Sequence, residues 1–340
     1  MTTTFKPAKR ENVPLLIGLD GASGSGKTYS ALLLADGIAS TIGAAQGRDG
    51  RIFGIDTERG RMLHYADDFK FMHGAVEPPF RPQAYGDAIK QAETAGADVI
   101  VIDSFSHCWE GEGGVREWAE ELERGGERSP KNWMVPKTAH KRLVNQMLAV
   151  RAHIIVCLRS EEKMKIEAVA QTNPDGSPKM WQGKPSTKMV ITPAADVPLL
   201  ERWVPICEKR FPFEITTSLL LTPQDPGVPI PRKLQEQHRP FFPEEQRIGR
   251  EAGEALARWS MGGATSRLAS PATSSGDVIT LDEARASILR ATDLPALEAE
   301  WRNKAMGPHR GTLANELASR KAELTPTQQH QEEGQSYAGV

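Results

Sequence analysis

Hydrophobic and polar positions divide the first part of the chain into short apolar runs and longer amphipathic stretches. The runs are rich in Ile, Val or Leu and end at glycine or polar residues, which predicts strands at Pro14–Asp20, Arg51–Asp56, Asp98–Asp103 and His153–Leu158. The amphipathic stretches predict helices at Lys27–Ser40, Pro82–Ala95 and Thr138–Val150. Because both faces of these strands are apolar, we expect an α/β fold whose mostly parallel sheet is flanked by helices.

The same pattern continues to about residue 260 and then changes. Before the change, we expect two further strands and one helix, at Phe213–Thr222, Ile230–Leu234 and Glu244–Trp259. After it, Gly, Ser, Ala and Thr predominate, as in a flexible linker. The segment Thr280-Leu-Asp-Glu283 then has the pattern of a capping box, and helical stretches follow it at Leu294–Lys304 and Thr312–Leu324.

The chain is therefore predicted to comprise a loose N-terminal tail (1–12), an α/β core (13–260), a flexible linker (261–277), a small C-terminal helical module (278–324) and a disordered tail (325–340). Its formal net charge of −2 gives no overall attraction to nucleic acid or to an anionic membrane. Three widely spaced cysteines fit a reducing cytosol and argue against structural zinc. With no secretory signal and no apolar run near the roughly 20 residues that span a bilayer, we expect a cytoplasmic protein without a membrane partner.

One segment carries a specific chemical pattern: Gly21-Ala22-Ser23-Gly24-Ser25-Gly26-Lys27-Thr28 matches the phosphate-binding loop G-x-x-x-x-G-K-[ST]. A predicted strand leads into it and a predicted helix follows it, which is the context that this loop requires. Glycines let the backbone N–H groups point at phosphate, and the helix adds its N-terminal dipole. We therefore expect this loop to bind ATP, with Lys27 on the β- and γ-phosphates and the Thr28 hydroxyl on Mg²⁺.

Two predicted strands deliver carboxylates to the edge of the sheet where ligands of parallel sheets bind. Asp103 ends one of them, so it is expected to support the Mg²⁺ ion together with Thr28. Glu58 closely follows the other, and it is our candidate for the catalytic group that positions the attacking water, with Asp56 next in line. The alternative for Asp103 is a strand that simply ends in a polar residue. The alternative for Glu58 is a solvated turn in which Asp56 caps a helix.

The order of these elements resembles the ATPase core of RecA-like recombinases, in which the Glu after the second strand orients the attacking water. The similarity is closer still to phage and prophage RecA-like ATPases of the single-strand annealing or recombination type. It is carried by LLIGLDGASGSGKTYSALLLADG, IDTERGRMLHYAD, VIDSFSHCWEGEGG and CLRSEEKMK, and it covers residues 14–259. The resemblance implies a RecA-like P-loop NTPase core with ATP and Mg²⁺ as cofactors. It also implies single-stranded DNA as partner and a homo-oligomer, ring or filament, with ATP at the subunit interface.

The resemblance further implies residues that complete the ATP site. RecA-like proteins carry a Gln as γ-phosphate sensor at the end of the fourth core strand, but this chain has no Gln there. Arg159 is the candidate for a charged sensor in its place, and an ordinary surface arginine is the alternative. Arg232 and Lys233 lie about where the family's basic residues reach the ATP of a neighbouring subunit, so they are the trans-acting candidates.

Two segments are basic although the whole chain is nearly neutral, and both lie where RecA-like proteins place their DNA-binding loops. Residues 129–160 contain no Asp or Glu, and residues 176–188 combine three lysines with one tryptophan. Glycine and proline predict that the second segment is a mobile loop, whose tryptophan offers a stacking surface for bases. The alternative for each segment is an ordinary solvated surface. The DNA-binding candidates are Lys131, Lys137, Lys141, Arg142, Lys179, Trp181, Lys184 and Lys188.

The sequence predicts a Mg²⁺-dependent ATPase. The resemblance implies that it is stimulated by single-stranded DNA and acts on it in phage recombination, annealing or replication, in the cytoplasm of a bacterial host. The resemblance also implies that its C-terminal module contacts a single-strand-binding protein or DNA. Two alternatives stay open. One is an ATP-switched loader or binding module with little turnover. The other is a small-molecule kinase, for which residues 176–188 make a poor lid because they contain no arginine.

Overall fold

The computed structural model describes residues 5, 7–173, 177–181, 184–194, 197–262, 281–302 and 310–324 of the protein. The chain divides into two compact units, residues 1–268 and 269–340. The predicted linker beyond residue 262 and the predicted tail 325–340 lie outside the described residues. None of the described helices combines the length and the apolar character needed to cross a membrane.

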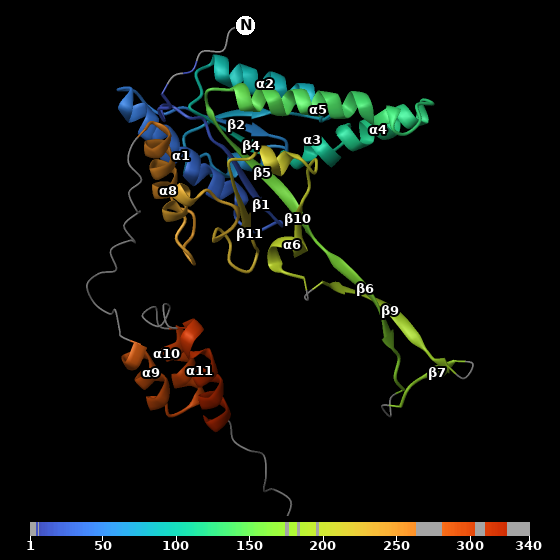
Figure 1. Ribbon diagram of the computed structural model, residues 1–340, viewed down its shortest axis with the longest axis vertical. Helices are drawn as coiled ribbons and strands as arrows, with labels where there is room; N and C mark the ends of the chain where they lie inside the picture. The colour runs from blue at the N-terminus through green and yellow to red at the C-terminus, as the bar shows by residue number, and fades with distance from the viewer. Residues whose placement is uncertain are drawn as a thin grey trace, which may run out of the picture. The chain divides into compact units, whose positions relative to one another are not determined.

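A central sheet runs through the N-terminal unit (Figure 1), and it confirms the expected mixed α/β fold. Its strands are β1 (Leu16–Gly21), β2 (Ile52–Asp56), β3 (Met72–Ala75), β4 (Val99–Asp103), β5 (His153–Glu162), β10 (Trp203–Pro205), β11 (Thr217–Leu221) and β12 (Pro229–Lys233). The order is β12-β11-β1-β5-β4-β2-β3, and β10 pairs with β5 beside this path. All neighbours are parallel except β12 on β11 and β10 on β5, so the sheet is mostly parallel.

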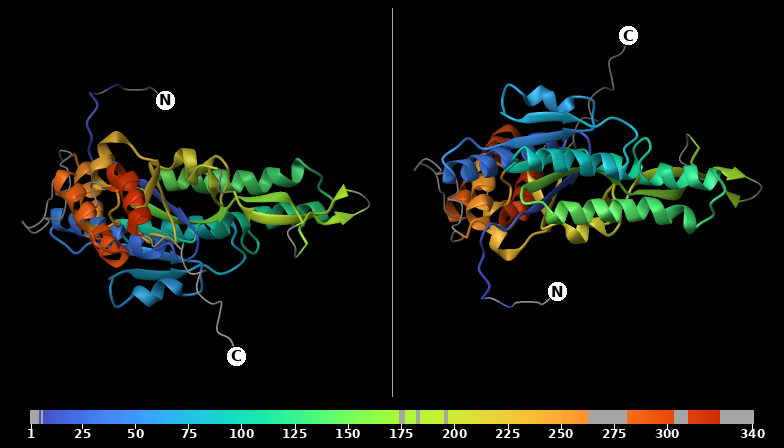
Figure 2. Two further views of the ribbon diagram at one scale, coloured as in Figure 1. Left: turned by 90° about the horizontal axis from the view of Figure 1, so that it is seen from below. Right: turned by 90° about the horizontal axis from the view of Figure 1, so that it is seen from above.

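Helices cover both faces of the sheet (Figure 2). α1 (Lys27–Ala45) and α8 (Arg250–Ser260) pack on one face, and α2 (Pro82–Thr94) and α5 (Lys131–Ala149) pack on the other. Alternate residues of β1, β4 and β5 enter the two resulting cores, which explains why these strands are apolar throughout. The shorter helical elements are η1 (Arg61–Tyr65), α3 (Ser106–Glu110), α4 (Val115–Arg124), α6 (Leu199–Arg202), α7 (Phe211–Glu214) and η2 (Glu236–Phe241).

Helix α5 begins at Lys131, well before the predicted start at Thr138. The sequence pattern favours a start after Pro136, because a proline in a helix interior removes one backbone hydrogen bond. In the structure Pro136 lies inside the helix and is buried. The helix is thus longer than the sequence pattern predicts, and the proline in its interior is buried.

Two predicted elements later in the chain are wrong at their starts. The strand predicted over Phe213–Thr222 begins only at Thr217, because Pro212 opens the short helix α7 instead. The helix predicted over Glu244–Trp259 begins at Arg250, since Glu245 has a positive φ of 59° and Gly249 precedes the first helical turn. The edge strand β3 is absent from the sequence prediction because Met-His-Gly-Ala is short and lacks a hydrophobic alternation.

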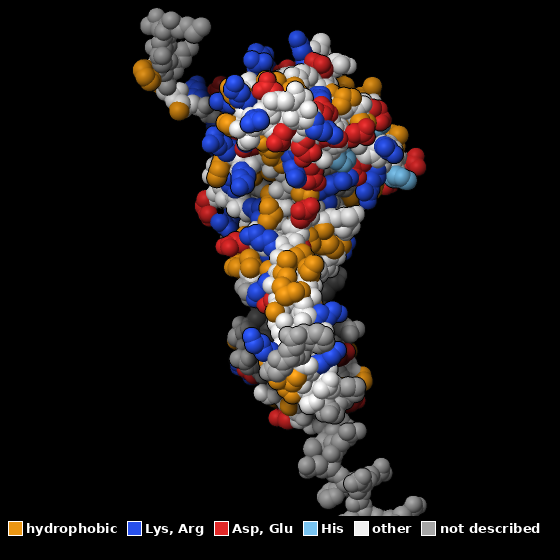
Figure 3. All heavy atoms as spheres, turned by 90° about the vertical axis from the view of Figure 1, so that its right-hand side faces the viewer, with side chains coloured by type: hydrophobic (Ala, Val, Ile, Leu, Met, Phe, Trp, Pro, Cys, Tyr) orange, Lys and Arg blue, Asp and Glu red, His pale blue; other side chains and the backbone are white. Residues whose placement is uncertain are grey.

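Between β5 and β10 the chain forms a two-stranded arm that projects from the core (Figure 1). β6 (Met164–Ala170) pairs antiparallel with β9 (Thr187–Pro193), and the short strands β7 (Met180–Trp181) and β8 (Lys184–Pro185) pair further out. Within residues 176–188, which the sequence predicts as a mobile loop, Met180–Trp181 and Lys184–Pro185 form β7 and β8, and β9 begins at Thr187. Apolar side chains lie along the arm in Figure 3, and several are more than half exposed: Met164, Ile166, Met180, Met189 and Ile191.

Close packing of α1 against α8 depends on two glycines. An added Cβ would lie 2.1 Å from the Arg250 carbonyl oxygen at Gly37, and 2.3 Å from the Leu34 carbonyl oxygen at Gly253. We predict that Gly37→Ala lowers the free energy of unfolding by about 1–3 kcal/mol, because the two helices must separate to admit the methyl group. Urea denaturation measures this loss.

Gly86→Ala in α2 is the matched control for that variant. An added Cβ there would meet only the side chain of Gln146, at 2.7 Å, and this side chain can move. Alanine also favours a helix over glycine by roughly 1 kcal/mol, so the control is expected to be near neutral. Equal destabilisation of the two variants would contradict the role of Gly37 in helix packing.

The C-terminal unit has a small core of its own. Its helices are α9 (Leu281–Arg290), α10 (Leu294–Arg302) and α11 (Arg310–Leu324), which coincide with the predicted helical stretches apart from a few terminal residues. An ion pair of 2.8 Å between Arg285 Nε and Glu316 Oε2 joins α9 to α11. The fully buried side chains of this core are Ala284, Ile288, Leu297 and Leu313.

Candidate functional site

The loop Gly21–Thr28 joins the end of β1 to the start of α1. Gly24 and Gly26 have φ angles of 79° and 83°, which residues with side chains rarely adopt. At Gly21 an added Cβ would lie 2.1 Å from the Leu221 carbonyl oxygen, so only glycine lets the loop come this close to β11. The loop thus places the first turn of α1 at the edge of the sheet, where its N–H groups and dipole favour an anion.

Lys27 folds back across this loop. Its Nζ donates hydrogen bonds to the carbonyl oxygens of Gly21 (2.9 Å) and Ala22 (2.7 Å). Burial lowers the pKa of the amine below its ordinary value, although the nearby charges of Asp103 and Glu58 act in the opposite sense. Lys27 therefore presents a cation beside the loop, facing two of the carboxylates that the sequence singled out.

Thr28 and Asp103 are in direct contact. The Thr28 hydroxyl donates a hydrogen bond of 2.5 Å to Oδ2 of Asp103, and this bond joins the start of α1 to the end of β4. Asp103 is buried, which raises the pKa of its carboxyl to about 6, although the hydrogen bond from Thr28 acts in the opposite sense. A hydroxyl and a carboxylate are oxygen ligands of the kind that Mg²⁺ prefers, so these two residues could hold a magnesium ion.

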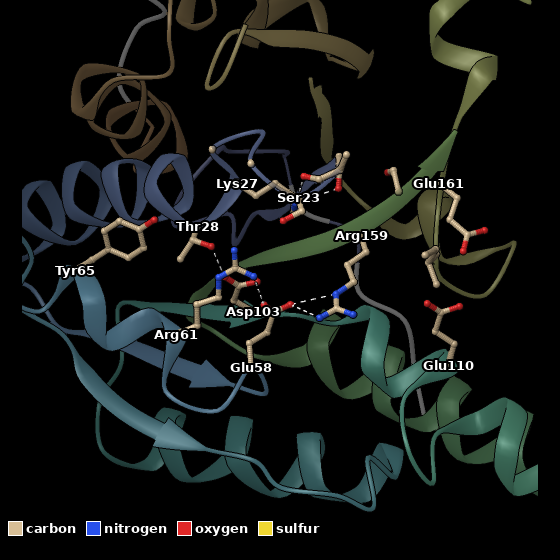
Figure 4. Close-up of a pocket in the computed structure, with 16 residues that line it drawn as sticks. Ser23, Lys27, Thr28, Glu58, Arg61, Tyr65, Asp103, Glu110, Arg159 and Glu161 are labelled. Atoms are coloured by element: carbon tan, nitrogen blue, oxygen red, sulfur yellow. Dashed lines mark hydrogen bonds and ion pairs between the residues drawn. The ribbon is translucent and has the colours of Figure 1, made fainter. Parts of the chain in front are cut away.

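Glu58 lies between two arginines (Figure 4). Its Oε1 accepts hydrogen bonds from Arg159 Nη2 (2.7 Å) and Nε (3.1 Å), and its Oε2 accepts one from Arg61 Nη1 (3.0 Å). Burial raises the pKa of this carboxyl, but the hydrogen bonds and charges of Arg159 and Arg61 outweigh burial and leave the pKa below its ordinary value. Glu58 is therefore ionised, and the two arginines balance its negative charge.

One cavity of about 530 Å³ brings these groups together. It is lined by the loop with Lys27 and Thr28, and by Asp103, Glu58 and Arg159. Ser25 is the one loop residue that does not line it, because its hydroxyl turns inward to the Ala22 carbonyl oxygen at 2.8 Å. Further cavity residues were missed by sequence reasoning: Arg61, Tyr65, Glu110, Ser160, Glu161 and Ile206. Arg61, three residues after Glu58, and Ser160, directly after Arg159, lie next to predicted site residues in the sequence.

Asp56 has a different place from Glu58. Its carboxylate accepts hydrogen bonds from the backbone N–H of Glu58 (2.6 Å) and of Met62 (3.0 Å), and Oδ2 lies 3.1 Å from His73 Nε2. Asp56 is buried and does not line the cavity. Its contacts fix the turn that carries Glu58, as the alternative of a capping role for Asp56 expected.

Arg232 is bound within its own chain. Its Nε and Nη2 donate hydrogen bonds of 2.8 and 2.9 Å to the two carboxylate oxygens of Asp20, and Nη2 also donates to the Trp203 carbonyl oxygen at 2.6 Å. Asp20 is buried, which raises the pKa of its carboxyl, while Arg232 acts in the opposite sense. To reach the nucleotide of a neighbouring chain, as the sequence predicts, Arg232 would have to give up these bonds and leave a buried carboxylate unpaired. Lys233 is exposed, with its Nζ 2.8 Å from the Phe213 carbonyl oxygen.

The candidate DNA-binding residues lie outside this cavity, on two different elements. Lys131, Lys137, Lys141 and Arg142 are exposed on α5. Lys179, Lys184 and Lys188 are exposed on the arm, where Trp181 belongs to β7, although its side chain lies outside what the structure describes. The structure does not bring these residues together with the loop, Asp103 or Glu58.

Comparison with models of known protein families finds no match to the chain, and comparison with curated proteins finds none either.

Proposed function

We propose that this protein is a magnesium-dependent ATPase with a RecA-like P-loop core that acts on single-stranded DNA. One observation supports the nucleotide assignment above the others: the glycine loop, Lys27, the Thr28–Asp103 pair and Glu58 surround a single cavity. The resemblance to phage RecA-like ATPases of the annealing or recombination type supports the DNA assignment.

The residues of the cavity fit a nucleoside triphosphate with Mg²⁺. Its volume of about 530 Å³ falls within the roughly 300–1,000 Å³ that is typical of ligand sites. Lys27 and the first turn of α1 would bind the β- and γ-phosphates. Thr28 and Asp103 would hold magnesium, which usually takes one or two protein oxygens together with phosphate and water. When bound, the ion would neutralise charge on the phosphates.

The chemistry of this chain's own residues would be positioning and charge stabilisation, without a covalent intermediate. Glu58 would orient the attacking water and accept its proton. In the structure, however, Arg159 and Arg61 bind the Glu58 carboxylate, which makes it a weaker base. Arg159 would therefore act as the sensor: by moving to the γ-phosphate it would release Glu58 for the water.

That ion pair also favours a second candidate function, an ATP-switched loader with little turnover. An ATPase assay with and without single-stranded DNA separates the two. We expect Mg²⁺-dependent hydrolysis that single-stranded DNA stimulates, because DNA would favour the state in which Arg159 has left Glu58. ATP binding without hydrolysis in both conditions would favour the loader, and phosphate transfer to a small molecule regardless of DNA would indicate a kinase.

The proposed DNA contacts lie on the arm and on α5, and the proposed assembly is a homo-oligomer, ring or filament, that shares ATP between chains. Lys233 is the trans-acting candidate that stays exposed. The C-terminal helical unit would bind a single-strand-binding protein. These assignments rest on the resemblance and on the exposed lysines.

Replacing Lys179, Lys184 and Lys188 together with alanine is expected to weaken binding of single-stranded DNA and its dependence on salt. The three side chains are exposed on the arm. Each contact with a phosphate releases counterions and contributes about 0.7 to the slope of log K against log salt, so the slope should fall by about 2. Fluorescence anisotropy of a labelled oligonucleotide at several salt concentrations measures it.

The matched control replaces three exposed lysines of the N-terminal unit that lie outside the arm, Lys70, Lys90 and Lys209. It removes the same total charge but leaves the arm unchanged, so its salt slope should equal that of the wild type. Identical slopes for the wild type and both variants would mean that the arm is solvated surface.

A further inference from the structure

A second cavity, of about 450 Å³, lies between α5 and the segment around α7. It shares no lining residue with the cavity of the glycine loop. α5 belongs to the basic, acid-free segment 129–160, whereas α7 follows the arm in the chain. The cavity therefore adjoins the proposed DNA contacts on α5, and no residue of the arm lines it.

His140 forms a buried part of the cavity wall and is only 4% exposed. Its ring lies 6.4 Å from that of Phe211 and 6.0 Å from that of Trp109, both edge to face. Burial lowers the pKa of the imidazole to about 4, so the ring is neutral at pH 7. Its Nε2 has no hydrogen-bond partner among the described residues. Buried polar atoms without a partner are rare, so a ligand with hydrogen-bonding groups would be favoured beside this ring.

Cations and carboxylates share the wall of the same cavity. We call Lys137, Lys141 and Arg210 the rim cations; all three are exposed, and none takes part in a salt bridge among the described residues. Glu208, Glu214 and the amide of Asn145 line the cavity as well. The cavity thus offers positive charge for an anion. Its carboxylates and its amide could bind a group that both donates and accepts hydrogen bonds.

Two half-buried tryptophans lie next to this cavity. The rings of Trp109 and Trp133 are 6.2 Å apart and inclined by 32°, and the Lys137 ammonium lies 5.0 Å over the ring of Trp133. Aromatic rings beside cations are the features on which bases of single strands stack, and both rings are partly accessible. They extend the site beyond the cavity itself.

We propose that this cavity binds one nucleotide of single-stranded DNA. The phosphate would contact the rim cations, and the edge of the base would face Asn145 and His140. The neighbouring nucleotide would stack on Trp133. This inference rests on the proposed DNA function, and it adds a second contact region to the arm, with Arg210 as a residue that the sequence did not single out.

The mixture of charges favours a nucleotide over an acidic peptide or free phosphate. Glu208 and Glu214 would repel a carboxylate-rich peptide, but carboxylates accept hydrogen bonds from the exocyclic amines of bases. Free phosphate would use the rim cations alone and leave His140 and Asn145 without a partner. A nucleotide uses all of these groups.

Two single variants separate phosphate from base contacts in anisotropy measurements with a labelled single-stranded oligonucleotide. Arg210→Ala should weaken binding on the order of tenfold and lower the salt slope by about 0.7, the value for one phosphate. Asn145→Ala should weaken binding by about three- to tenfold without changing the slope, because a lost hydrogen bond to a base releases no ions. Lys209→Ala is the matched control, since it removes the same charge beside Arg210 but does not line the cavity.

Photo-cross-linking with an oligonucleotide that contains 5-iodo-deoxyuridine locates the contact directly. We expect cross-linked peptides from residues 131–150 and 203–216, in addition to any from the arm. If the wild type binds DNA but Arg210→Ala and Asn145→Ala behave like Lys209→Ala, and cross-links map to the arm alone, this cavity is not a nucleotide site and the proposed function stands. If the wild type does not bind single-stranded DNA, the DNA part of the proposed function fails together with this inference.

Discussion

Lys27→Ala is expected to abolish tight ATP binding. Lys27 is the only charged residue in Gly21–Thr28, and its Nζ lies within 2.9 Å of two carbonyl oxygens of the loop, at the place where phosphates would enter. A charge-assisted hydrogen bond contributes about 1.5–3 kcal/mol, and Lys27 would make such bonds to both the β- and γ-phosphates. Affinity should therefore fall by at least about 100-fold. Isothermal titration calorimetry with Mg²⁺ and ATP measures it.

Lys90→Ala is the control for this variant, because Lys90 is exposed on α2 and lies outside the cavity. Its ATP affinity should equal that of the wild type. Thermal unfolding without nucleotide should be similar for the two variants, since the hydrogen bonds of Lys27 Nζ to described residues go to loop carbonyl oxygens. Unchanged ATP affinity of Lys27→Ala would rule out the glycine loop as the phosphate site.

Features that depend on neighbouring residues were predictable from the sequence. The strand–loop–helix segment around Gly21–Thr28 is encoded locally, since its glycines, its lysine and the flanking apolar runs are contiguous. The strands β1, β2, β4 and β5 were predictable because burial on both faces requires continuous apolar runs. Asp103 could be placed beside Thr28 because parallel strands end at one edge of the sheet.

Features that depend on contacts between distant segments were not predictable. Glu58 and Arg159 are 101 residues apart, and nothing in either segment indicates that the two side chains form an ion pair. Arg232 is separated from Asp20 by 212 residues, and nothing near either residue in the sequence indicates that the two side chains form an ion pair within one chain. The arm was missed because β6 and β9 are exposed on both faces, and exposed strands lack the burial pattern on which strand prediction depends.

Glu58→Gln should leave ATP binding near that of the wild type while hydrolysis is nearly lost. Glutamine keeps the size of the side chain and can still accept a hydrogen bond from Arg159, but it cannot take a proton from water. Loss of a general base typically costs about 10²–10⁴ in rate. Phosphate release from ATP under saturating conditions measures the rate, and calorimetry measures the affinity.

Glu161→Gln tests whether any glutamate of the cavity would have this effect, since Glu161 also lines it but has no bond to Arg159. It should retain most of the activity. Arg159→Ala adds a second distinction, because it frees Oε1 of Glu58, while Arg61 still bonds Oε2, and removes the proposed sensor at once. If Arg159 only restrains Glu58, hydrolysis should rise in Arg159→Ala. If Arg159 senses the γ-phosphate as proposed, hydrolysis should fall although Oε1 of Glu58 has lost its arginine partner. Normal turnover of Glu58→Gln would exclude Glu58 as the group that activates water. Asp56 would be a poor substitute, because it is buried and already accepts hydrogen bonds from the backbone of Glu58 and Met62.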